Sequence, residues 1–204
     1  MTTLQHALKK LLTIHKVWIW IFFFIAGSSS WSTEKPLFVY LNKKGFFPAT
    51  IKNNPVYDPA FSDGSVKPIL EDLGFKKVIH SNKNLWDSFS SDLKDPNTAV
   101  LCNPPWSKEN WLTPFFLLLE NLDLPFLLIL NEETVKTNYF KLFEERRENL
   151  KRYHLGNKTF PFRNEANVSH KFNKVVICVD YPQAWNWSPL DCQVRAVFEV
   201  KQDI

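Results

Sequence analysis

One short stretch constrains the fold of this chain more than any other. Residues 98–102 (TAVLC) form an apolar, strand-like run that ends in the tetrapeptide Asn103-Pro104-Pro105-Trp106. Proline has no backbone N–H, so two prolines in succession cannot continue a hydrogen-bonded ladder. The strand is therefore expected to stop at Asn103. An amide, two rigid carbonyls and an indole ring follow its carboxyl end, which is where open α/β sheets bind ligands.

The segments around this strand predict alternating strands and helices. Strands are expected at residues 37–41, 76–80, 125–130 and 174–179, with an alternating edge strand at 194–200. Helices are expected at 66–73, 110–122 and 138–149, with Gly74 as a C-cap, Pro114 in a first turn and a polar loop at 42–54. This order predicts an α/β three-layer sheet, and the continuously apolar strand at 125–130 is typical of a parallel sheet covered on both faces.

Composition and charge set the scale of the fold. The chain has 204 residues, of which 45% are apolar, which is enough for one domain with a sizeable core. The net charge of +4 permits a nucleic-acid partner without arguing for one. The three cysteines, Cys102, Cys178 and Cys192, are widely spaced, so no zinc-type pattern is present and no metal is expected.

The N-terminal segment is distinct from the rest of the chain. Residues 1–16 carry three lysines and no acid, and residues 17–26 (VWIWIFFFIA) are continuously apolar. A basic region followed by a short apolar run resembles a secretory signal, and the run is shorter than the roughly 20 residues of a comfortable membrane span. A membrane anchor through residues 11–26, an organelle-targeting segment and a wrongly chosen start codon are the alternatives. We therefore predict one folded domain at 33–204 and leave its compartment open.

Two further surface features have alternative interpretations. Three Asn-x-Ser/Thr tripeptides, beginning at Asn157, Asn167 and Asn186, fit the N-glycosylation pattern, and they also arise by chance in an Asn-rich chain. The densest basic cluster lies near the end of the expected charged helix. Its members are Arg146, Arg147, Lys151 and Arg152. A solvated helix face is expected there, and contact with phosphates is the alternative.

The tetrapeptide Asn103-Pro104-Pro105-Trp106 resembles the (Asn/Asp/Ser)-Pro-Pro-(Tyr/Phe/Trp) motif of S-adenosylmethionine-dependent amino-methyltransferases. That group includes DNA N6-adenine and N4-cytosine methyltransferases, some RNA enzymes, and enzymes that methylate a protein glutamine amide. The resemblance implies that the Asn103 side-chain oxygen and the Pro104 carbonyl accept the N–H bonds of the target amine. Trp106 would stack on the flipped base. A turn that merely ends a strand is the alternative.

A second segment resembles the first motif of the same family, (Asp/Glu)-Pro-x-x-x-x-Gly. Residues 55–65 (PVYDPAFSDGS) lead from an apolar pair through a small-polar loop into the expected helix at 66–73. A nucleotide-type cofactor requires this strand–loop–helix order. In the family, the backbone of this loop holds the methionine moiety of the cofactor. The residues that would line the pocket are Asp58, Pro59, Phe61, Asp63 and Gly64. Only one glycine is present where many relatives have two or three, and an ordinary βα turn is the alternative.

The family pattern is weakest where the cofactor's ribose and adenine would bind. Relatives carry an acid at the end of the second strand for the ribose hydroxyls, and an Asp further on for the adenine. Here no acid follows the expected strand at 76–80 until Asp87, and Asn84 stands where the adenine-contacting Asp is sought. Ser81 and Asn82 are poorer partners for a ribose diol, because the charge-assisted hydrogen bonds are lost. His80, at the end of this strand, is expected to be structural, with a role as a base as the alternative.

The resemblance covers about residues 36–180 and implies a Rossmann-like methyltransferase fold with a mostly parallel sheet and a late antiparallel strand. The expected activity is S-adenosylmethionine-dependent methyl transfer to an exocyclic amine, with N6 of adenine in DNA or RNA as the first candidate. A protein amide is another candidate acceptor. Two other hypotheses stay open. One is a methyltransferase-fold binding module that has lost catalysis, and the other is a membrane-tethered or secreted domain of unrelated function.

Overall fold

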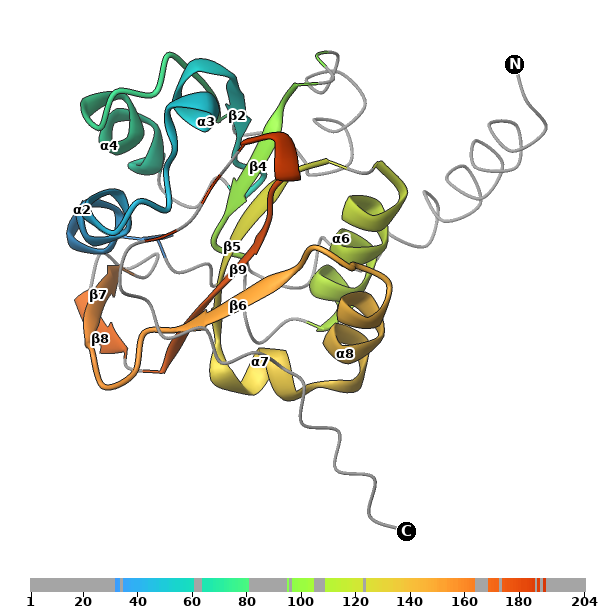
Figure 1. The fold of residues 1–204 in the computed structure, drawn as a ribbon. Coiled ribbons are helices and arrows are strands. Elements are labelled where there is room, and N and C mark those ends of the chain that lie inside the picture. Colours follow the sequence, from blue (N-terminus) through green and yellow to red (C-terminus); the bar gives the residue numbers. More distant parts are fainter. Residues whose placement is uncertain are drawn as a thin grey trace, which may run out of the picture.

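The computed structural model describes residues 32–33, 35–60, 64–80, 95, 97–104, 109–122, 124–163, 169–172, 174–185, 187 and 189. Within this part of the chain the central element is a six-stranded mixed sheet (Figure 1). In spatial order its strands are β3 (Lys77–Ile79), β2 (Pro55–Tyr57), β4 (Ala99–Cys102), β5 (Phe126–Asn131), β9 (Val175–Asp180) and β6 (Lys151–His154). The first four run parallel to one another, and β9 lies antiparallel between β5 and β6.

Helices pack on both faces of this sheet. One face is covered by α2 (Lys35–Lys43), α3 (Ala49–Asn53) and α4 (Val66–Asp72). The other is covered by α6 (Glu109–Leu122) and α8 (Asn138–Glu145), and the short helix α7 (Glu132–Lys136) follows β5 directly. The predicted α/β architecture is therefore confirmed, and a mostly parallel sheet of this kind is compatible with a Rossmann-like fold.

The alternation of side chains along β5 explains why the strand is continuously apolar. Leu127 and Ile129 belong to the core under α2, α3 and α4, whereas Phe126, Leu128 and Leu130 belong to the core under α6 and α8. Successive side chains of a strand point to opposite faces, so a strand covered on both sides needs apolar residues at every position. The predicted strands at 76–80, 98–102, 125–130 and 174–179 are all confirmed.

A second, smaller sheet lies beside the main one. It contains β1 (Ser32–Thr33), β7 (Phe160–Arg163) and β8 (Ser169–Phe172), all antiparallel. The ring of Phe162 packs edge-on against Phe172 across the β7–β8 pair, with centroids 5.5 Å apart. The edge strand expected at 194–200 lies outside the described residues.

The prediction of a strand at 37–41 is wrong, because these residues belong to α2. Leu37, Phe38 and Leu41 are buried, and this spacing places them on one face of a helix. A short apolar run without clear periodicity does not distinguish a strand from a buried helix turn. The polar loop expected at 42–54 is interrupted by α3, which buries Ile51.

The helix predictions hold with adjusted boundaries. Helix α4 ends near Gly74, whose φ of +93° is the left-handed conformation of a C-terminal cap, as predicted. Pro114 lies inside α6, beyond the first turn where we expected it, so one backbone hydrogen bond of that helix is missing. The charged helix expected at 138–149 ends at Glu145, and it buries Phe140 and Phe143 on one side.

The prediction that the basic cluster forms a solvated face is wrong for two of its members. The side chain of Arg147 is only 8% exposed; its guanidinium lies 3.2 Å from Asp180 and donates to the carbonyl of Leu119. The largely buried Arg152 lies 2.9 Å from Glu144. These arginines neutralise acids that come from other elements. Arg147, just after α8, contacts α6 and β9, and Arg152 joins β6 to α8.

Candidate functional site

The candidate site lies where the parallel strands end. Because β3, β2, β4 and β5 are parallel, their carboxyl ends meet at one edge of the sheet, which we call the carboxyl edge. Asp58 follows β2, His80 follows β3 and Asn103 follows β4, while Asn131 is the last residue of β5. Both sequence motifs thus reach the same edge, although they lie far apart in the chain.

Asp58 is the most heavily constrained residue of this edge. Its carboxylate is buried, and one oxygen (Oδ1) accepts the backbone N–H of Ala60 at 3.0 Å, which closes a tight Asx-type turn. The other oxygen (Oδ2) lies 3.1 Å from Nδ1 of His80. The backbone N–H of Asp58 donates to the carbonyl of Ile79 at 3.0 Å, so the pairing of β2 with β3 extends to the site itself.

Burial controls the protonation of Asp58 and of its neighbour Cys102. Desolvation raises the pKa of Asp58 above its ordinary value, and His80, the N–H of Ala60 and Cys102 oppose the rise by contacting the carboxylate. Burial and the negative charge of Asp58 hold the pKa of the Cys102 thiol well above its usual range. Cys102 therefore stays a thiol at neutral pH, and it is an inert neighbour of the site rather than a nucleophile.

Asn103 and Pro104 complete the described part of the site. Both are buried, and they directly follow Cys102, whose thiol is within hydrogen-bonding reach of the Asp58 carboxylate. Strands β2 and β4 are hydrogen-bonded neighbours in which Tyr57 pairs with Val100. Adjacent strands lie about 4.8 Å apart, so the structure brings Asp58, Pro59, Asn103 and Pro104 to neighbouring strand ends.

Other predicted residues of the site are described in part or not at all. Gly64 adopts the left-handed φ of +79° just before α4, a backbone conformation that favours glycine. The remaining predicted residues lie outside the described residues; these are Phe61, Asp63, Asn84, Pro105 and Trp106.

The contact between His80 and Asp58 is the part of the site that the sequence motifs did not predict. The His80 side chain is 1% exposed and points toward the carboxylate. The signal was present in the chain, since His80 is the last residue of the strand predicted at 76–80 and Asp58 directly follows an apolar pair. Recognising the pair required knowing that β2 and β3 are neighbours, which neither motif states.

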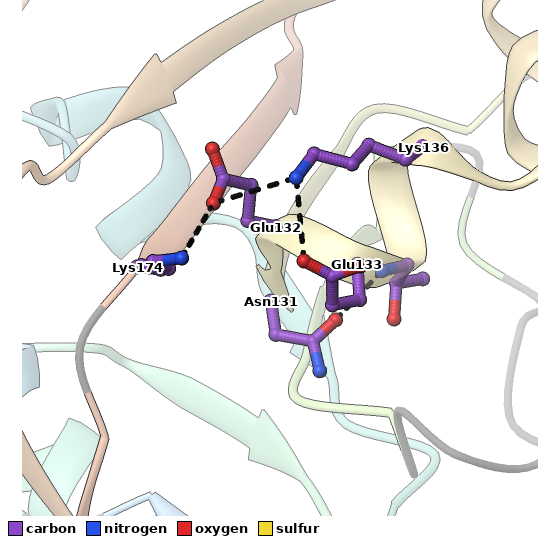
Figure 2. Close-up of polar contacts among 6 residues, drawn as sticks. Asn131, Glu132, Glu133, Lys136 and Lys174 are labelled. Atoms are coloured by element: carbon purple, nitrogen blue, oxygen red, sulfur yellow. Dashed lines mark hydrogen bonds and ion pairs between the residues drawn. The ribbon is translucent and has the colours of Figure 1, made fainter.

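Charged side chains at the end of β5 form a separate network (Figure 2). The Asn131 oxygen (Oδ1) accepts the backbone N–H of Thr134 at 2.7 Å and caps α7. One oxygen of Glu132 lies 3.7 Å from the ammonium of Lys136 and 3.6 Å from that of Lys174. Lys174 has a φ of +59°, and its carbonyl accepts the N–H of Glu132 at 3.0 Å, so the β8–β9 connection is fastened to this strand end.

Glu132 is too distant to supply a carboxylate at the end of β3, where the resemblance leads us to expect an acid for the ribose of a cofactor. Strands β2 and β4 stand between β3 and β5, which puts about 14 Å between the two strand ends at the usual strand spacing. Glu132 is also held by two lysines of its own neighbourhood. The other two acids considered for that role, Asp63 and Asp87, lie outside the described residues.

A pocket of about 440 Å³ lies at the opposite edge of the sheet. It is formed where β6 begins and β9 ends, and it is lined by Glu148, Asn149, Lys151, Tyr181, Pro182, Gln183 and Trp187. The first residue of β5, Phe126, pairs with Asp180, so this pocket lies at the amino ends of the parallel strands. It contains no residue of either motif.

The described residues contain no group of three or more His, Cys, Asp or Glu side chains arranged to hold a metal ion. None of the helices in the described ranges is long and apolar enough to cross a membrane, and the apolar run at 11–26 lies outside those ranges. Comparison of the sequence with models of known protein families gives no match, and comparison with curated proteins gives none either.

Proposed function

We propose that this chain is an S-adenosylmethionine-dependent methyltransferase that acts on an exocyclic amine, with N6 of adenine in nucleic acid as its substrate. One observation carries the proposal. Asp58 and Asn103, which come from two motifs far apart in the sequence, lie at the ends of the adjacent parallel strands β2 and β4. A turn that merely ends a strand would give no reason for the two motifs to converge.

The order of strands gives further support. The methyltransferase resemblance leads us to expect a parallel sheet that is closed by a late antiparallel strand. Strand β9 has this position, since it is antiparallel to both of its neighbours, β5 and β6. Generic α/β sheets also accept such strands, so the topology supports the proposal less strongly than the convergence of the motifs.

On the cofactor side, the described residues fit the methionine end of S-adenosylmethionine. The buried carboxylate of Asp58 suits a cationic ligand, and the turn through Ala60 with the left-handed Gly64 lets backbone groups approach a ligand closely. When bound, the cofactor supplies a methyl group on a sulfonium sulfur.

On the substrate side, Asn103 and Pro104 would hold the amine. Their two oxygens accept its N–H bonds and thereby turn the nitrogen lone pair away from the ring and toward the methyl group. Asn103 and Pro104 would thus aim the amine at the methyl group that the cofactor would supply, and the nitrogen would release one proton to solvent once it is methylated. The rate gain comes chiefly from this positioning, because no group of the site has to act as a nucleophile.

A binding module that has lost catalysis is the second candidate, and a specific observation favours it. Glu132 follows β5, too far from the end of β3 to contact a ribose there, and the His80 side chain is turned inward against Asp58. A weakened ribose site would reduce affinity for the cofactor while leaving the fold intact.

Calorimetric titration of S-adenosylmethionine into the full chain separates the two candidates. We expect saturable binding at micromolar affinity, largely retained in Asn103→Ala and strongly weakened in Asp58→Asn. The asparagine keeps the acceptor for the Ala60 N–H and removes only the charge, so it is a matched probe of the carboxylate. Methyl transfer is then measured on single- and double-stranded DNA, on RNA and on a glutamine peptide. Absence of binding at millimolar cofactor would refute the enzyme and favour the module.

A further inference from the structure

We propose that His80 is a positioning residue of this site, which holds the Asp58 carboxylate and, through it, the turn at residues 58–60 in the conformation that receives the cofactor. The inference rests on the proposed function. It extends that proposal to a residue that neither motif contains, on a strand that neither motif occupies.

The carboxylate of Asp58 connects the end of β2 with the end of β3 and with the loop that follows β2. Its Oδ2 atom contacts the imidazole of His80 at the end of β3, and its Oδ1 atom accepts the N–H of Ala60 in the loop. Beneath the side chains, the N–H of Asp58 reaches the carbonyl of Ile79. Both side chains are almost fully buried, so solvent cannot substitute for either partner.

The charges around Asp58 explain why the imidazole matters. The groups that face this carboxylate in the described chain are His80 from the end of β3, Cys102 from the end of β4, and the N–H of Ala60. Cys102 stays a neutral thiol, since burial and Asp58 raise its pKa. Among these three, His80 is therefore the group that can carry a positive charge opposite the carboxylate.

Removal of the imidazole changes the chemistry of the carboxylate in a definite direction. Burial already raises the pKa of Asp58, and the contact with His80 opposes that rise. Without His80 the pKa rises further, and the carboxylate takes up a proton at a higher pH than in the wild type. A neutral carboxylic acid attracts a cationic cofactor less than a carboxylate does, so binding falls as the pH drops through the raised pKa.

The experiment measures S-adenosylmethionine affinity of the full chain from acidic to mildly alkaline pH, for the wild type and three variants. His80→Phe fills the space without a donor, His80→Asn keeps a donor, and His154→Phe changes another histidine that ends a strand, β6. For His80→Phe we expect binding about tenfold or more weaker at neutral pH, with partial recovery at higher pH. His80→Asn keeps the donor without the charge, so it should recover part of the affinity while its pH midpoint stays above that of the wild type. His154→Phe should match the wild type.

Each result has a distinct meaning. Wild-type affinity and pH profile in His80→Phe would overturn the positioning role and leave the proposed function standing. Equal losses in His80→Phe and His80→Asn, with the wild-type pH profile in both, would also overturn it. A wild type that binds no S-adenosylmethionine at any pH refutes the proposed function and the positioning role together. If His80→Phe does not fold, as judged by its thermal unfolding, the pH midpoint of His80→Asn decides, and an unchanged midpoint overturns the role.

Discussion

Replacing Arg147 with methionine tests whether the buried arginine is a structural link or a surface charge. The guanidinium is 8% exposed and lies 3.2 Å from Asp180, whose side chain is 11% exposed. It also donates to the carbonyl of Leu119 and lies 5.6 Å from the ring centroid of Phe126. Methionine retains the apolar stem but leaves Asp180 buried without the guanidinium.

The expected loss follows from this burial. Removing one partner of a buried ion pair costs about 3–5 kcal/mol, because the remaining charge keeps its desolvation penalty. For a chain of this length that corresponds to a fall of about 6–20 °C in the unfolding temperature. The neighbouring pair between Arg146 and Glu120 is a matched control, since Arg146 is 55% exposed. Arg146→Met should cost less than about 1 kcal/mol.

Urea unfolding followed by circular dichroism measures both variants, with the midpoint and slope fitted together. The double variant Arg147→Met/Asp180→Leu should recover most of the loss, since it removes both buried charges and keeps apolar volume. The reasoning is refuted if Arg147→Met is no less stable than Arg146→Met. It is refuted equally if the double variant is as unstable as the single one.

Three further predictions concern the candidate site and the buried cysteines. Asn103→Ala should reduce the rate of methyl transfer, measured by single-turnover assays, at least about a hundredfold. Its cofactor affinity, measured by calorimetry, should stay within about threefold of the wild type. Equal losses of rate and affinity would show that Asn103 does not act on the substrate side. Because burial raises the pKa of Asp58 above 3.8, the folded chain binds that proton more tightly than the unfolded chain. The stability of the wild type relative to Asp58→Asn should therefore fall as the pH rises from 3.8 through the raised pKa, and urea titrations at a series of pH values that show a constant difference would contradict this. Cys102 and Cys178 are buried and have raised pKa values, so a thiol reagent should label them only after unfolding; mass spectrometry of peptides labelled under native conditions checks this.

The central strands were predictable because their sequences satisfy both faces of the sheet at once. The run at 126–130 (FLLIL) and the run at 175–179 (VVICV) leave no polar position, and only a strand covered on both sides needs that pattern. The run at 37–41 is equally apolar but belongs to a helix. Its length is too short to show a period, and the decision between the two structures comes from packing against β7 and α4 that local sequence does not contain.

The candidate site was predictable only as far as its residues belong to local motifs. Asp58 and Asn103 could be found because proline follows each of them and fixes the chain at a strand end. The contact of Asp58 with His80 depends on strand order, and the contact of Arg147 with Asp180 joins residues that are far apart in sequence. Such contacts depend on the topology of the fold. Basic residues that the sequence suggests are solvated can therefore be in direct contact with acids from distant parts of the chain.

The position of β9 also affects how the chain folds during its synthesis. Strand β9 is the latest in sequence of the six, yet it supplies the only described sheet pairing of β6 and one full side of β5. Until residues 175–180 have been made, the apolar run at 126–130 has an open edge, and open apolar edges recruit other chains. A chain truncated before residue 175 is therefore expected to be prone to edge-to-edge aggregation, and the wild-type sheet is completed only after residues 175–180 have emerged from the ribosome.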